Sequence, residues 1–208
     1  MAARGRKSIY AVHPGVRMVQ KWIEELPEKT GRSLPQWLAF IEKKGPKGAE
    51  ARRAWLKKEH GLGTNSAWWL ADRADGKGHE DGDPDLYLRA AEAYVEAQYA
   101  GKKAALRPIY DGLLRLAFSV GKDVKACPCQ TIVPLYRHHV FAEIKPTTLT
   151  RVDLGLALGD AKTPKRLVDT GGFEKKDRIT RRIAIGSPAE IDAEVKRWLE
   201  RAYAMDAG

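Results

Sequence analysis

Apolar residues recur at steps of three and four through the first part of the chain, and this spacing predicts helices. One helix is expected to follow Pro14 and to end at Gly31, because glycine commonly terminates helices. A second begins after Ser33, which forms the pattern of a capping box with Gln36 three residues later. Two more helices are expected over about 48–60 and from about 64 onward. The first block therefore reads as a small helical bundle.

The period of the pattern changes in the second part of the chain. Helices are expected over about 84–99 and 105–119, and an amphipathic helix closes the chain after about 190. Between them apolar and polar residues alternate, which is typical of strands. These strands are expected at residues 124–127, 130–137, 139–145, 151–158 and 179–185. Their connections are too short for helical crossovers, so the sheet should be largely antiparallel.

A polar stretch separates the two blocks. Residues 75–83 (DGKGHEDGD) are rich in glycine and acid and show no apolar period, which is typical of a linker. We expect a helical domain over residues 1–75, a linker over 76–84 and an α+β domain over 85–208, with helices on one face of the sheet. Five of the six tryptophans lie in the first 70 residues, which fits two domains of different composition.

The overall composition is that of a globular protein, with 43% hydrophobic and 31% charged residues among 208. The sequence has no run of about 18 apolar residues, so no membrane span is expected. The basic start of the chain has no apolar stretch long enough for a signal peptide. Two cysteines cannot build a disulfide framework. We therefore expect a cytoplasmic protein.

The chain also resembles a bacterial two-domain family of unknown function. The C-terminal α+β domain of that family is similar to the strand region VPLYRHHVFAEIKPTTLTRVDLGLAL and to the later segment RLVDTGGFEKKDRITRRI. Its small N-terminal helical domain is similar to the front segment VQKWIEELPEKTGRSLPQWLAFIEKKGPKG. The α+β domain is distantly similar to YdhG-like domains, some of which are described as frataxin-like iron chaperones. The resemblance implies two domains and a bacterial source, but no activity and no catalytic residue.

Charge is the unusual property of the sequence. Lys and Arg number 37 against 27 Asp and Glu, which gives a net charge of +10 and a pI of about 9.6. Residues 1–75 hold 15 basic and 8 acidic residues, and residues 101–208 hold 20 and 13, with an acidic stretch between them. An excess of this size favours an anionic partner, which we expect to be nucleic acid or an acidic protein.

Two basic segments supply the candidate contacts to nucleic acid. The helices expected over 48–60 and after 64 are joined by a short glycine-containing turn, which is the outline of a helix-turn-helix. The second segment is the loop over 160–177, where basic residues surround two glycines. The candidates are Arg52, Arg53, Lys57, Lys58, Lys165, Arg166, Lys175 and Lys176. The alternative is a plain bundle with a solvated loop.

Alternation also sorts the expected strands into an apolar face beneath the helices and an open face. The open face would carry Arg151, Asp153, Arg182, His139, Phe141 and Lys145. Such a surface suits a small anion or a nucleotide, because guanidinium and ammonium groups bind phosphate and an aromatic ring stacks on a base. The alternative is a set of cross-strand ion pairs on a solvated face. A slip of one residue in register would exchange the two faces.

Cys127, Cys129 and His138 are the candidate metal ligands, because thiolate and imidazole are the groups that zinc prefers. Their spacing matches no familiar closed site, and two reduced cysteines are the alternative. The sequence contains no motif for a nucleophile, a phosphate loop or a dinucleotide fold, so no catalytic residue and no cofactor is predicted.

The sequence thus favours a binding module, rather than an enzyme, that contacts nucleic acid or another anionic partner. Two alternatives stay open at this point. One is a ligand-binding or enzymatic site on the open sheet face, and the other is the handling of a metal, iron or zinc.

Overall fold

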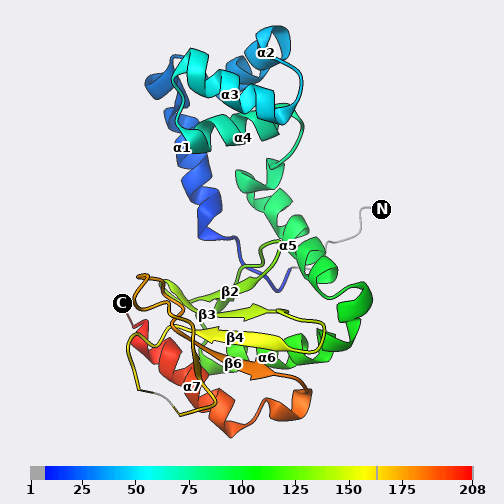
Figure 1. The fold of residues 1–208 in the computed structure, drawn as a ribbon, viewed down its shortest axis with the longest axis vertical. Helices are drawn as coiled ribbons and strands as arrows, with labels where there is room; N and C mark the ends of the chain where they lie inside the picture. The colour runs from blue at the N-terminus through cyan, green and yellow to red at the C-terminus, as the bar shows by residue number, and fades with distance from the viewer. Residues whose placement is uncertain (1–7, 163, 208) are drawn as a thin grey trace. The chain divides into compact units, whose positions relative to one another are not determined.

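The computed structural model describes residues 8–162 and 164–207, which divide into two compact units. The first unit spans residues 12–88 and is helical. The second joins residues 8–11 to residues 89–207 and contains the sheet with its helices (Figure 1). The chain is therefore of the α+β class, as the sequence predicted. Among the described residues, no helix is long and apolar enough to cross a bilayer.

Four helices build the first unit: α1 (Pro14–Thr30), α2 (Leu34–Lys44), α3 (Ala49–His60) and α4 (Thr64–Ala74). Local signals set their ends. The side chain of Gln36 accepts the backbone N–H of Ser33 at 2.8 Å, as the capping pattern predicted. Gly31 ends α1 with a φ of 75°, a conformation that glycine adopts without strain. The four expected helices are confirmed.

Aromatic side chains fill much of the core of the first unit. Trp37 on α2 is fully buried, and the rings of Trp22 and Trp69 meet edge to face with centroids 4.8 Å apart. Such pairs add to the free energy gained from burying apolar area. Trp68 differs from the others, because 51% of its surface is exposed. Packing therefore explains most, but not all, of the tryptophans in this unit.

The segment expected to be a linker packs within the first unit. It contains a short 3-10 helix, η1 (His79–Asp81), and the side-chain amide of Gln20 donates to the carbonyl of Gly82 at 3.2 Å. Asp83 then caps α5 (Pro84–Gln98), accepting the backbone N–H of Leu86 at 3.0 Å. The boundary between the units falls within α5, at residues 88–89, rather than over residues 76–84.

The sheet of the second unit has six strands in the order β1-β2-β3-β4-β6-β5, and every neighbouring pair is antiparallel. This confirms the antiparallel prediction. The strands are β1 (Lys125–Ala126), β2 (Val133–Tyr136), β3 (Val140–Lys145), β4 (Val152–Leu156), β5 (Val168–Asp169) and β6 (Arg181–Ile185). The helical segments are η2 (Gly101–Leu106), α6 (Arg107–Val120), η3 (Pro188–Glu190) and α7 (Ala193–Met205). In Figure 1 the strands lie in front of α6.

The register places the expected apolar residues on one face. Ala142 pairs with Leu156, and Leu154 pairs with Ile183, and all four side chains are fully buried. They share one core with α6 and with α7, where Leu199 is also fully buried. Because side chains alternate along a strand, the intervening residues face away from these helices.

Phe141 corrects one part of the predicted open face. Leu135 pairs with Ala142 while Tyr136 pairs with Val140, so Phe141 is an extra residue in a β-bulge. Its ring is fully buried and meets the ring of Tyr203 edge to face. The prediction that Phe141 stacks on a ligand at the open face was wrong, because the bulge breaks the alternation on which it relied.

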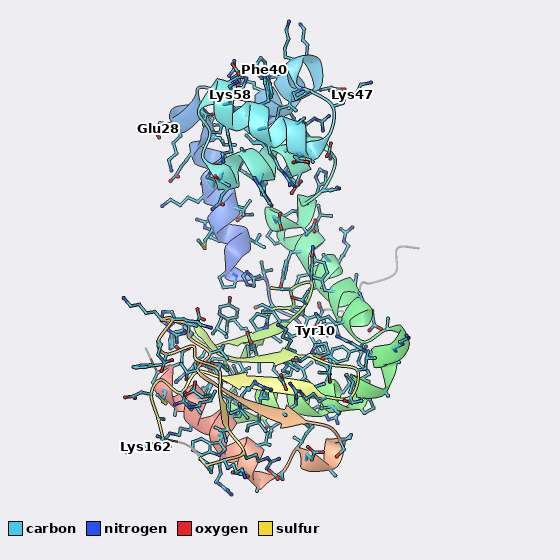
Figure 2. All side chains as sticks on the ribbon, viewed as in Figure 1. Tyr10, Glu28, Phe40, Lys47, Lys58 and Lys162 are labelled. Carbon is cyan, nitrogen blue, oxygen red and sulfur yellow. The ribbon has the colours of Figure 1, made fainter. Side chains whose placement is uncertain are left out.

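The start of the described chain belongs to the second unit, although the sequence suggested the helical domain. The backbone N–H of Ala11 donates to the carbonyl of Ala126 at 2.9 Å, beside the edge strand β1. The hydroxyl of Tyr10, labelled in Figure 2, lies 3.0 Å from that of Tyr110. The sheet therefore has one of its edges partly covered by a segment that precedes the helical unit.

Candidate functional site

A pocket of about 600 Å³ opens at one end of the sheet in the second unit. Three segments line it: the chain that follows β4, the loop between β5 and β6, and the C-terminal end of α7. Ala157, Ala202 and Met205 give it an apolar lining, and its charged lining residues are two bases and three acids: Lys176, Arg178, Glu174, Asp177 and Asp206. A pocket of this size and mixed character is typical of a binding site.

The loop between β5 and β6, residues 170–180, is held by its own hydrogen bonds. The hydroxyl of Thr170 donates to the carbonyl of Ile179 at 2.8 Å and accepts the backbone N–H of Gly172 at 3.1 Å. The backbone N–H of Asp177 donates to the carbonyl of Gly172 at 2.8 Å. A loop tied in this way presents its outer side chains in fixed positions.

Phe173 is the most unusual side chain of this loop. Half of its surface is exposed, and it lines the pocket together with Met205, which is also half-exposed. Lys175 and Lys176 follow and are exposed. Lys176 has a positive φ of 59°. Among the described residues, every other residue with a positive φ is a glycine. Unfavourable backbone conformations of this kind concentrate at functional sites.

Asp206, the C-cap residue of α7, joins three segments of the second unit. Only 3% of its side chain is exposed. One carboxylate oxygen, Oδ2, accepts the backbone N–H groups of His138 at 3.0 Å and His139 at 2.8 Å. The other, Oδ1, lies 3.1 Å from Nδ1 of His139 and accepts Nη2 of Arg178 at 2.8 Å. Asp206 and Arg178 also line the pocket.

The surroundings keep Asp206 ionised. Burial raises the pKa of this carboxyl, but the hydrogen bonds from His139 and the positive charge of Arg178 outweigh burial and hold the pKa below its usual range. A carboxylate only accepts hydrogen bonds, so a neutral His139 ring must donate from Nδ1. The acceptor nitrogen of that ring is then Nε2.

Comparison with protein families places this pocket in a known domain. Residues 95–206 match the family described as Domain of unknown function (DUF5655). The chain belongs to the DUF5655 family. Residues 18–76 match a second family, Domain of unknown function (DUF4287), which covers most of the first unit. No curated protein and no solved structure matches the chain.

These matches agree with the two-domain family that the sequence resembles, and they say nothing of YdhG-like domains. The DUF5655 region contains the pocket, the β5–β6 loop and Asp206. Sequence reasoning placed Lys175 and Lys176 in a basic loop but missed Phe173 and Asp206. One signal was available for Asp206: a negative charge at the C-terminus of a helix opposes the helix dipole and needs a local reason.

Three of the open-face candidates meet on the DUF5655 sheet as an ion-paired group. Asp153 lies between two arginines, with Oδ1 at 3.0 Å from Nε of Arg151 and Oδ2 at 3.0 Å from Nη1 of Arg182. Lys145, which pairs with Asp153 in the register, is exposed. His139 stands apart from this group and contacts Asp206 instead. The arrangement supports the alternative of cross-strand ion pairs.

The arginines among the nucleic-acid candidates are occupied by carboxylates. Arg52 pairs with Asp75, and Nη2 of Arg53 lies 2.8 Å from Asp72. The guanidinium of Arg53 also lies 4.1 Å from the centre of the exposed Trp68 ring. In the DUF5655 domain, Arg166 binds two acids near the start of α7 and the carbonyl of Glu190.

The lysines among the candidates remain exposed. Lys57 and Lys58 lie on α3, and Lys58 approaches Glu59 at 4.0 Å. In the DUF5655 domain the candidates Lys165, Lys175 and Lys176 are exposed, as is the nearby Lys162, which is labelled in Figure 2. None of these four forms an ion pair within residues 8–162 and 164–207. They are the cations of this surface that a ligand can neutralise.

The candidate metal ligands do not come together. Cys127 is fully buried, and burial raises the pKa of its thiol to about 12. Over the described part of the chain, no group of three or more histidine, cysteine, aspartate or glutamate side chains has the geometry to hold a metal ion. Cys127, Cys129 and His138 therefore do not form the proposed site.

Proposed function

We propose that the second unit binds single-stranded nucleic acid at the β5–β6 loop. The observation that carries this proposal is Phe173, a half-exposed aromatic ring on a hydrogen-bonded loop beside a pocket. Two exposed lysines follow it at positions 175 and 176. Proteins that bind single strands combine these two elements, an aromatic ring for a base and cations for the backbone.

The distribution of charge supports the same surface. Residues 12–88 hold 13 basic and 12 acidic residues, whereas residues 89–208 hold 21 and 15. The excess positive charge of the two units therefore lies almost entirely in the second unit. Four of its exposed lysines that form no ion pair, at positions 162, 165, 175 and 176, lie in the chain between β4 and β6, which also forms one side of the pocket.

The aromatic ring favours single strands over duplexes. A ring at the tip of a loop stacks on a base only when that base is not covered by its neighbours, as in single strands. The pocket beside Phe173, at about 600 Å³, has room for a base turned out of the strand. We therefore expect single-stranded DNA and RNA to bind more tightly than duplex DNA.

Fluorescence anisotropy with a labelled 12-nucleotide single strand tests this function. We expect binding at 50 mM salt that weakens as salt rises, because counterions leave the strand when lysines bind it. Phe173→Ala should weaken binding by about 5- to 100-fold, the range for loss of one stacked base. Lys175→Gln with Lys176→Gln should lower the slope of log affinity against log salt by about 1.4.

The first unit supplies a matched control. Lys57→Gln with Lys58→Gln removes the same charge from two adjacent exposed lysines on α3. This variant should bind the strand within about twofold of the unmodified protein. The proposal is wrong if no strand binds at 50 mM salt, or if both lysine pairs contribute equally.

A further inference from the structure

His139 is an exposed ring oriented by a buried carboxylate. The side chain of His139 is 63% exposed, and that of Asp206 is 3% exposed. Two backbone N–H groups already attach Oδ2 of Asp206 to the turn before β3, so the tie between α7 and this turn does not depend on the ring. The contact from Nδ1 to Oδ1 instead fixes how the ring is turned and which nitrogen carries the proton.

The ring also lies close to the pocket. Arg178 lines the pocket and donates to Oδ1, the same oxygen that Nδ1 of His139 contacts. Nε of Arg178 donates to the carbonyl of Val140, the residue that follows His139. A single carboxylate oxygen therefore separates the histidine from a side chain of the pocket wall.

Few charged groups face this histidine. Asp206 and Arg178 are the charged partners from α7 and from the β5–β6 loop. On the same turn, Arg137 is held by Asp123 at 3.0 Å. Nε2 of His139 makes no hydrogen bond within residues 8–162 and 164–207, so it is free to accept a proton from a bound molecule.

These contacts match the arrangement of a general base, in which a carboxylate orients a histidine whose other nitrogen takes a proton. We infer that His139, positioned by Asp206, cleaves RNA bound at the β5–β6 loop. This inference rests on the proposed function, because the bound single strand is its substrate. It adds an activity that single-strand binding does not require.

The reaction is an internal transfer at phosphorus. Nε2 of His139 takes the proton of a ribose 2′-hydroxyl, and the 2′-oxygen forms a bond to the adjacent phosphorus. The bond from phosphorus to the 5′-oxygen of the next nucleotide breaks, and that oxygen takes a proton from water. The products are a 2′,3′-cyclic phosphate and a 5′-hydroxyl. Lys176, which lines the pocket together with Arg178, supplies positive charge that stabilises the charge developing on the phosphate oxygens.

The test compares RNA and DNA of one 12-nucleotide sequence, each labelled at its 5′ end, in buffer with a chelator. We expect the protein to bind both strands but to shorten only the RNA, because DNA has no 2′-hydroxyl. The RNA products should end in a 2′,3′-cyclic phosphate, because the 2′-oxygen is the nucleophile.

Variants of the two adjacent histidines separate this activity from a contaminating nuclease. His139→Ala should reduce the rate by at least about 100-fold, retain DNA binding and regain part of its rate with added imidazole. His138→Ala, purified in the same way, should cleave normally, because the His138 ring has no hydrogen bond among the described residues. Asp206→Asn should slow cleavage by about tenfold or more and alter its pH profile.

The outcomes distinguish this inference from the proposed function. If RNA binds but stays intact, the assignment of His139 fails while single-strand binding stands. Cleavage that persists unchanged in His139→Ala also overturns the assignment. If neither RNA nor DNA binds, the proposed function itself has failed.

Discussion

The α3 arginines of the first unit and the β5–β6 lysines of the second differ in how they are paired. In the first unit the arginines of α3 pair with Asp72 and Asp75, and one of them also covers Trp68. In the second unit the lysines around the β5–β6 loop have no ion-pair partner within the described chain, and the aromatic ring beside them is open. The arginines of α3 are thus paired within their own unit, whereas the lysines of the β5–β6 loop are available to a ligand.

This difference shows what the net charge of +10 can and cannot indicate. A charge count predicts attraction to polyanions but does not say which cations are free to bind. An arginine in an ion pair still adds to the net charge, but it is not free to bind an anion. The position of acids such as Asp72 therefore matters as much as the position of the bases.

The largest expected effect tests whether the units are separate. Leu70 and Leu154 are fully buried in different core clusters, one in each unit. Leu70→Ala and Leu154→Ala should each cost about 2–5 kcal/mol of unfolding free energy, because each leaves a cavity. Hydrogen exchange should show the loss of protection only in the unit that carries the change. Equal loss in both units would show that they unfold as one.

The next effect concerns the carboxylate that organises the pocket. Asp206→Asn should lower the stability of the second unit by about 2–3 kcal/mol at pH 7, because it weakens hydrogen bonds that involve a charged group. The folded pKa of Asp206 is depressed, so its stabilisation is full above the unfolded pKa of about 3.9 and is lost as pH falls through the folded value. Chemical denaturation of the parent and of Asp206→Asn at pH 7 and pH 3 measures this loss of stabilisation. A difference between variant and parent that persists unchanged at pH 3 would contradict it.

A smaller effect tests the fixed shape of the β5–β6 loop. A Cβ on Gly172 would lie 2.4 Å from the carbonyl oxygen of Ile179, so Gly172→Ala must shift backbone. We expect a cost of about 1–3 kcal/mol and weaker binding of a single strand. Gly63→Ala in the first unit is the matched change, since no atom lies within 4 Å of its Cβ position. Thermal unfolding and anisotropy should separate the two variants.

The smallest expected effect tests whether ion pairing of the α3 arginines explains why the first unit does not bind the strand. Asp72→Asn with Asp75→Asn should free Arg52 and Arg53 at a cost of about 1 kcal/mol, because ion pairs that retain contact with solvent contribute little. In a protein that also carries Lys175→Gln and Lys176→Gln, this change should restore weak, salt-sensitive binding of a single strand, by about threefold. Unchanged binding would mean that paired arginines are not what makes the first unit inactive.

Local patterns were sufficient for most of the fold. Steps of three and four residues found the helices of the first unit, and alternation assigned Leu154 and Ile183 to the covered face of the sheet. Phe141 shows the limit of that method. Its burial depends on a bulge opposite Leu135 and Tyr136, and the alternating pattern holds no mark of it.

The candidate site was less accessible from the sequence, because its parts meet through distant contacts. Asp206 is 67 residues from His139 and 28 from Arg178. The sequence shows the lysines of the loop, but it does not show that the end of α7 forms a pocket with this loop. The sequence therefore located a basic segment, and only the fold showed which residues surround it.

The hydrogen bond from Ala11 to Ala126 has a practical consequence for dissecting this protein. The first unit is inserted into the second, so the chain passes between the two units at residues 11–12 and again at residues 88–89. A fragment that starts at residue 89 would leave the edge of β1 uncovered and open to pairing with another chain. Removing residues 12–88 and joining the two ends with a short flexible linker would keep that edge protected.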